Sequence, residues 1–235
     1  MEGVGELRRW SPGEGLGQAA RRYGSSGVPV LPCHHPAIIL GPGRLRGLAC
    51  SCGAAACQAP AEHPVPARWV EEATSDPGRI AAWWRQQPGY NVGLLTGGAF
   101  EVLDVPARLG EAALRRCGIR KLAGPVARTG NGRYHFNVTA IGMTNGFVPS
   151  QPGAGRSGVF WHGEGGWVIA PPSRHVSGEA CRWLQTLDAP LPTAHLVLRE
   201  LLDARDGLAH DAALGAAAAG ERAAGDPAGP SRSLS

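Results

Sequence analysis

The sequence predicts an α+β domain in which helices flank a mixed sheet and an irregular insert is held by a bound metal. Helical and strand patterns follow one another without an internal repeat, and cysteines cluster in a Gly- and Pro-rich stretch at about 33–64. A length of 235 residues with 43% hydrophobic content is enough for one sizeable core. We expect a domain over residues 14–206, a flexible arm at 1–13 and a disordered Ala- and Gly-rich tail at 207–235, in which alanine also permits some helix.

The N-terminal elements are short. From Gly15, the stretch "GLGQAARRYGSSG" predicts a helix that ends at glycine, and "VPVLP" at 28–32 predicts a strand. Residues 33–64 contain so many glycines and prolines that we expect no regular secondary structure there. A loop of this length inside a domain needs a cross-link, such as a bound metal, to hold it in place.

The middle and C-terminal parts alternate between the two element types. Asp76 or Ser75 as N-cap, Pro77 in the first turn and a stop near Pro88 predict a helix over 77–86. Two apolar strands follow, "NVGLLTG" and "AFEVLDV", and then a helix in "LGEAALRRCGI". The remaining elements are three strands and a last helix, predicted in "GRYHFNVTAI", "SGVFWHG", "GWVIAPPS" and "LPTAHLVLRELLDARDG".

Four potential metal ligands lie within 14 residues of the insert. Cys50, Cys52, Cys57 and His63 have the spacing C-x-C-x4-C-x5-H. Zinc prefers four such sulfur and nitrogen ligands in a tetrahedron, and coordination orders a loop that has no core of its own. The pattern therefore favours a structural zinc site over free cysteines that happen to cluster.

The sequence does not decide which residue is the fourth ligand. Cys33, His34 and His35 lie just upstream and are alternatives to His63. A catalytic zinc would need an open coordination position and a nearby general base, for which Glu62 is the candidate.

Charge and hydropathy bound the possible partners. The formal charge of +4 favours phosphate binding only mildly, so it permits a nucleic-acid partner without requiring one. The N-terminus has no apolar run typical of a signal peptide, and no window approaches the roughly 20 apolar residues of a membrane span. We expect a cytoplasmic protein with no membrane contact.

One acid lies at the end of a predicted strand. In "EVLDVP", apolar residues lead to Asp104, and a proline follows two residues later. In "TGNGRYHF", two glycines precede a strand that carries His135, and such a turn lets backbone N–H groups approach an anion. Each feature also has a simpler explanation, an acid that caps a turn and a histidine that packs in a sheet.

The order of several motifs points to one family. The chain resembles the N-terminal domain of bifunctional DNA primase/polymerases, in the archaeo-eukaryotic primase superfamily, from about Gly15 to Leu184. The resemblance implies a primase/polymerase-type sheet and template-directed nucleotidyl transfer. The stretches that carry it are "VPVLP", "CSCGAAAC...HP", "DPGRIAAWW", "NVGLLTG", "VLDV", "TGNGRYHF", "GGWVIAPPSRHVSG" and "CRWL".

The catalytic acids of that family are incomplete in this chain. Family members end the strand in D-x-D or D-x-E, and the acids hold two divalent metals beside the triphosphate. The resemblance assigns Asp104 as the first acid, but Pro106 stands at the second position and Phe160 at the third. Glu101 falls on the opposite face of a regular strand, and Glu164 aligns with a later turn. The resemblance therefore implies a degenerate member.

Other residues align with the family's nucleotide cleft. Asn131 and His135 align with an S-x-H-like element, so His135 joins Asp104 as a candidate catalytic residue. Arg133 and Arg174 are candidates for binding a phosphate, because guanidinium pairs with phosphate whether or not metals are present. A turn role for the "PPS" element before Arg174 is equally consistent with the sequence.

Three functions remain open. The first is a primase/polymerase-like domain that binds nucleotide or single-stranded nucleic acid but has lost most nucleotidyl transfer. The second is an active enzyme that uses Asp104, His135 and a repositioned acid such as Glu101 or Glu164, with magnesium or manganese as cofactor. The third is a zinc-stabilised interaction module without nucleic acid. The first two imply nucleotide and DNA partners, single-stranded or primer-template, together with replication or plasmid/phage-type proteins.

Overall fold

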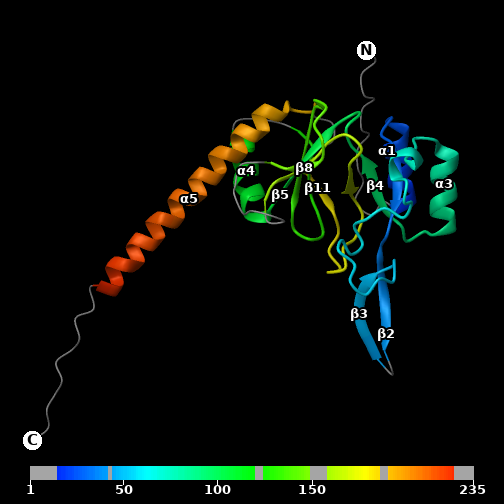
Figure 1. Cartoon of the computed structure of the whole chain (residues 1–235), viewed down its shortest axis with the longest axis horizontal. Helices are drawn as coiled ribbons and strands as arrows, with labels where there is room; N and C mark the ends of the chain where they lie inside the picture. The colour runs from blue at the N-terminus through cyan, green and yellow to red at the C-terminus, as the bar shows by residue number, and fades with distance from the viewer. Residues whose placement is uncertain (1–14, 42–43, 120–123, 149–157, 186–189, 225–235) are drawn as a thin grey trace, which may run out of the picture.

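The structure is a computed structural model that describes residues 15–41, 44–119, 124–148, 158–185 and 190–224. Its strands form a three-stranded sheet, a six-stranded sheet and a separate two-stranded hairpin. Helices lie beside both larger sheets, and the hairpin projects away from them (Figure 1). The α+β class with flanking helices is confirmed. The predicted mixed sheet would contain both parallel and antiparallel strands. Each described strand pair is antiparallel.

The three-stranded sheet has the order β1-β4-β10 and carries the N-terminal core. Helices α1 (Leu16–Ser25) and α3 (Pro77–Gln86) pack beside it, and the short α2 (Trp69–Glu72) precedes α3. Tyr23 and Ile80 from the two helices are buried in one cluster with Val92 of the sheet. The strands are β1 (Val30–Cys33), β4 (Asn91–Leu95) and β10 (Trp167–Ala170).

Helix α3 has the predicted bounds because its start is encoded locally. The Asp76 carboxylate accepts a hydrogen bond from the backbone N–H of Arg79 at 2.6 Å, and Pro77 occupies the first turn. Trp84 is buried in the N-terminal core, and its indole N–H donates to the carbonyl of Tyr90.

The six-stranded sheet has the order β11-β6-β7-β5-β9-β8, with β5 near its centre. One face is covered by α4 (Ala107–Ile119) and α5 (Ala194–Ala224), whose apolar side chains pack on Leu103 and Val105. The strands are β5 (Glu101–Val105), β6 (Val126–Arg128), β7 (Tyr134–Val138), β8 (Gly146–Phe147), β9 (Phe160–His162) and β11 (Arg182–Gln185).

The other face of this sheet carries one cross-strand row of functional interest. Phe147 pairs with Phe160, Phe160 with Asp104, Asp104 with His135, and His135 with Ala127. Because paired residues project to the same side, all five side chains share this face. Ala127 is buried against residues of the three-stranded sheet, so the row faces the space between the two sheets.

The insert contains more regular structure than the sequence predicts. Strands β2 (Pro36–Gly41) and β3 (Arg44–Cys50) pair as a hairpin, with an irregularity between Ile39 and Leu40. The expectation of no regular structure at 33–64 is wrong for this part. Apolar runs on either side of a Gly-Pro-Gly turn signal can pair locally in spite of their glycines and prolines.

Helix α5 is longer than the domain boundary at residue 206 suggests. It continues to Ala224, through the first part of the tail that the sequence predicts to be disordered. Alanine has the highest helix propensity, and this segment is rich in it. The arm at 1–13 and residues 225–235 lie outside the described ranges. Within those ranges, no helix combines the length and apolarity needed to cross a membrane.

Candidate functional site

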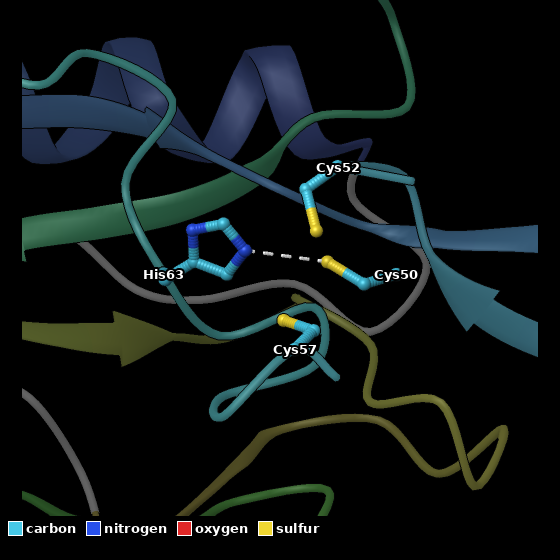
Figure 2. A group of neighbouring side chains, drawn as sticks. All are labelled: Cys50, Cys52, Cys57 and His63. Atoms are coloured by element: carbon cyan, nitrogen blue, oxygen red, sulfur yellow. Dashed lines mark hydrogen bonds between the residues drawn. The ribbon is translucent and has the colours of Figure 1, made fainter. Parts of the chain in front are cut away.

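The four predicted metal ligands converge on one point. The sulfurs of Cys50, Cys52 and Cys57 and a ring nitrogen of His63 all lie within 4.8 Å of one another. Figure 2 shows the four side chains pointing inward, with His63 Nε2 3.4 Å from Cys50 Sγ. Cys50 ends β3, and the other three ligands come from the turns that follow it. The fold therefore brings the end of a strand and the turns after it to one cluster that could hold a metal ion.

Backbone groups of the loop prepare this cluster for a metal. The N–H of Ala61 donates to Cys50 Sγ at 3.2 Å, and the N–H of Ala54 donates to Cys52 Sγ at 3.5 Å. The Ala54 hydrogen bond, and after it the contact with His63, lower the pKa of the Cys52 thiol to about 7. Thiolates with N–H donors around them suit a tetrahedral ion such as zinc.

Of the candidates for the fourth ligand, His63 is the one that joins the three cysteines, and the alternatives have other surroundings. Cys33 is fully buried in an apolar cluster, and burial raises the pKa of its thiol. His34 Nδ1 lies 2.9 Å from the Ser51 hydroxyl, and the His35 ring faces Tyr90 at 6.0 Å between centroids.

A cavity of about 180 Å³ lies beside the insert, between the two larger sheets. Its floor is the row of β5 and β7 described above, and Val168 and Ile169 of β10 line it from the other sheet. Its polar lining consists of Glu62, Asp104, Thr129, Asn131, His135 and His162. The structure thus brings the predicted residues Asp104, His135 and Asn131 together.

Asp104 is held by an arginine from the glycine turn. Arg133 Nε donates to its carboxylate at 2.7 Å, and the same guanidinium donates to the carbonyl oxygens of Asp104 and Gly158. His135 Nε2 and His162 Nε2 lie 3.8 and 3.7 Å from the carboxylate. Arg133, a predicted phosphate ligand, therefore binds an internal carboxylate here.

The charge states follow from this packing. Burial raises the pKa of Asp104, but the His162 contact and the charges of its neighbours outweigh it and lower the pKa to about 2. Burial lowers the pKa of His135 to about 4, so its ring is neutral at pH 7. Arg133 supplies a positive charge beside Asp104 at neutral pH.

Glu62 is the acidic residue of the cavity lining that the sequence did not assign to this site. Its carboxylate accepts from the Asn131 amide at 2.9 Å, and its backbone carbonyl accepts from the Trp167 indole at 3.3 Å. Burial raises its pKa to about 7. Its position next to His63 pointed only to a base for zinc chemistry. Its place in the cavity depends on how the insert folds back over the sheet.

The positions of the missing acids have other roles. Glu101 lies on the helix-covered face of a regular β5, where its carboxylate accepts from the Trp161 indole and the Met143 N–H, both at 2.9 Å. Pro106 follows β5, and its carbonyl accepts from Gly110 in the first turn of α4. The Phe160 ring contacts Phe147 at 5.0 Å and His162 at 4.8 Å between centroids.

Two further predicted residues lie apart from the cavity lining. Arg174 is exposed, and its guanidinium donates to the carbonyl of Gly178 in the same turn. Asn91 fixes this turn by hydrogen bonds to both backbone groups of Arg174. Glu164 is exposed in the turn after β9. The structure therefore supports the turn role of the "PPS" element.

Comparison with known proteins agrees with the order of motifs. A search of curated proteins finds no match. A family model described as "Bifunctional DNA primase/polymerase, N-terminal" matches residues 20–196, which includes the four metal ligands and the whole polar lining of the cavity. Since this match covers most of the 235 residues, the chain belongs to the bifunctional DNA primase/polymerase N-terminal family.

Proposed function

We propose that this domain binds nucleotide or single-stranded nucleic acid at the Asp104 cavity and that its nucleotidyl transfer is lost or severely reduced. The observation that carries the proposal is the ion pair between Arg133 and Asp104. The guanidinium takes the place beside the carboxylate that a divalent cation would need. We also propose that zinc is the ion held by the cysteine and histidine cluster.

The electrostatics of metal catalysis support the loss of activity. Two divalent ions beside a triphosphate need several carboxylates, and missing ligands reduce the rate by orders of magnitude. Among the described residues, Asp104 and Glu62 are the acids that line the cavity. In this part of the chain, the cysteine and histidine cluster is the group of three or more His, Cys, Asp or Glu side chains whose ligand atoms lie close enough together to hold a metal.

An active nucleotidyltransferase is the second candidate, and Glu62 is the observation that favours it. Glu62 enters the cavity from the insert and so supplies a second carboxylate from outside the strands. Neither Glu101 nor Glu164 lines the cavity, so Glu62 replaces them as the repositioned acid in this alternative.

Nucleotide incorporation separates the two candidates. Labelled nucleotide is offered with primed and unprimed single-stranded templates, with magnesium or manganese, to the wild type and to the Asp104→Ala and Glu62→Gln variants. We expect no extension by any of the three proteins. Extension by the wild type that both substitutions abolish would establish the active enzyme instead.

Binding is measured on the same proteins without catalysis. We expect the wild type to bind a labelled oligonucleotide or a nucleoside triphosphate, which an interaction module without nucleic acid would not do. Glu164→Gln is the matched control, because it removes an exposed carboxylate that does not line the cavity. Wild-type protein that binds neither ligand would overturn the proposal.

A further inference from the structure

A second cavity lies on the far side of the glycine turn. It measures about 330 Å³, and its lining includes Arg128 and Arg182, backbone of Gly130 and Gly132, and Glu179. It belongs to neither the metal cluster nor the Asp104 cavity. Its two arginines are not among the residues that align with the family's nucleotide cleft.

The arginines are placed side by side by strand register. Arg182 of β11 pairs directly with Arg128 of β6, so the two side chains project to the same side of the sheet. Like charges in directly opposite positions repel each other. A sheet that holds two cations in this arrangement is stabilised when an anion lies between them.

Arg128 also has an unused donor. Its Nε is buried, and none of the described residues accepts a hydrogen bond from it. A buried polar group without a partner is unfavourable, and an anion in the cavity would supply the missing acceptor. Guanidinium groups bind phosphate oxygens through their planar array of donors.

The net charge of the lining fits one phosphodiester. Two arginines and the Glu179 carboxylate leave a single excess positive charge, which equals the charge of one phosphodiester in size. Glu179 also limits the affinity for free polyanions. The two glycines leave backbone exposed for close approach, and Gly132 has a φ of +89°, a conformation that glycine adopts without strain.

The two cavities share one wall. Thr129 lines both of them, and the turn that follows it carries Asn131 and Arg133, the partners of Glu62 and Asp104. Alternation along β6 places Arg128 on the opposite face of the sheet from Ala127, so a phosphate bound at the arginine pair would lie across the Thr129 end of the sheet from the Asp104 cavity. We propose that Arg128 and Arg182 form a metal-independent phosphate site that holds the backbone of a nucleic-acid strand as it passes round this end of the sheet into that cavity.

This inference rests on the proposed function, so its test must separate the two. Fluorescence anisotropy of a labelled oligothymidylate of about 16 nucleotides is measured over a series of salt concentrations. The proteins are the wild type, Arg182→Gln, Arg128→Gln and the control Arg115→Gln. Arg115 is an exposed arginine of α4 that lines neither cavity, so its removal changes the net charge equally.

We expect Arg182→Gln and Arg128→Gln each to weaken oligonucleotide binding roughly tenfold at low salt. Each should also reduce the slope of log K against log salt by about 0.7, the value for one phosphate contact on a single strand. Arg115→Gln should leave the slope unchanged. Because Arg182 is exposed, its substitution should not affect folding, and Arg182→Lys should restore part of the affinity.

A parallel titration with a nucleoside triphosphate distinguishes the source of the phosphate. Loss of oligonucleotide binding with triphosphate binding retained supports the backbone site as proposed. Equal loss of both would assign the arginine pair to the triphosphate and overturn the strand assignment. If both arginine variants match Arg115→Gln while the wild type binds, the site is absent but the proposed function stands. No wild-type binding to either ligand would overturn both.

Discussion

Asp104 shows how the neighbours of a residue decide its role. It lies at the end of a central strand, where the family places a metal-binding acid, yet its carboxylate is paired with Arg133 and flanked by two histidines. A carboxylate that is already neutralised by a guanidinium gains less from a divalent ion than an unpaired one. The residue type is retained, and the arginine changes what it can do.

Buried His135 should make stability depend on pH. Its pKa is lowered from 6.5 to about 4, so between these values the unfolded chain binds a proton that the folded chain does not. The free energy of unfolding should therefore fall by up to about 2 kcal/mol from this residue between pH 7 and pH 5. Urea unfolding of the wild type and His135→Gln at both pH values measures the difference. An equal pH dependence in the two proteins would contradict the prediction.

Glu101 should matter for stability and not for nucleotide binding. Its fully buried carboxylate is the acceptor for the Trp161 indole and the Met143 N–H, and Glu101→Ala leaves both donors without it. We expect a loss of about 2 to 4 kcal/mol in the free energy of unfolding. Glu164→Ala, at an exposed position, is the control and should change it by less than about 0.5 kcal/mol. A stable Glu101→Ala protein that no longer binds nucleotide would contradict this prediction and assign Glu101 a role in nucleotide binding.

The insert combines two elements with different sources of order. Its hairpin is held by strand pairing, whereas the turns after β3 contain few apolar side chains and carry three of the four metal ligands. His63 and Glu62 are adjacent, so an ion bound by His63 would also fix the backbone of Glu62. A bound ion would therefore support one wall of the Asp104 cavity.

Zinc content should depend on the residues of the cluster and not on the nearby Cys33. We expect about one zinc per chain in the wild type, and less than about half an equivalent in Cys52→Ala, with a Tm lower by about 5 °C or more. Cys33→Ala is the matched control, because Cys33 is close in sequence but buried in an apolar cluster away from the ion. Elemental analysis and thermal unfolding measure both effects. Full zinc occupancy in Cys52→Ala would remove that residue from the ligand set.

In the whole molecule, the two faces of the six-stranded sheet have separate tasks. One face packs against α4 and α5 and buries the apolar residues of β5 and β7. The other face carries Asp104, His135 and Phe160 toward the second sheet and the insert. Successive side chains of a strand point to opposite faces, so these two groups of residues are separated by the sheet. Substitutions in the apolar group should affect stability, and substitutions in the Asp104 group should affect binding.

The extent of the folded domain can be tested by shortening α5. The buried residues of this helix are Ala194, Val197, Glu200, Leu201 and Ala204, and the positions described after Ala204 are partly or fully exposed. A chain that ends at residue 209 should keep its Tm within about 3 °C. A chain that ends at residue 196 loses all of these buried residues except Ala194 and should not show a cooperative transition. Circular dichroism melting measures both, and a large drop in Tm for the longer chain would place more of the helix in the domain.

Predictions that depended on local chemistry succeeded more often than those that depended on distant partners. Asp76 and Pro77 encode the start of α3, and residue spacing placed Glu101 on the face opposite Asp104. The hairpin at 36–50 was missed because glycine and proline content outweighed its paired apolar runs. Glu62 was missed because nothing near it in the sequence indicates which side of the sheet it approaches.

The sequence by itself determined the family, the order of the elements and the four residues of the cysteine and histidine cluster, because each depends on short motifs or fixed spacings. Only the tertiary structure decided that Glu62 from the insert, Asn131 from the glycine turn and Asp104 from β5 line one cavity, and that Arg133 neutralises Asp104. These contacts join residues far apart in the chain. Their geometry is fixed by the packing of the insert against two sheets, which local residue patterns do not encode.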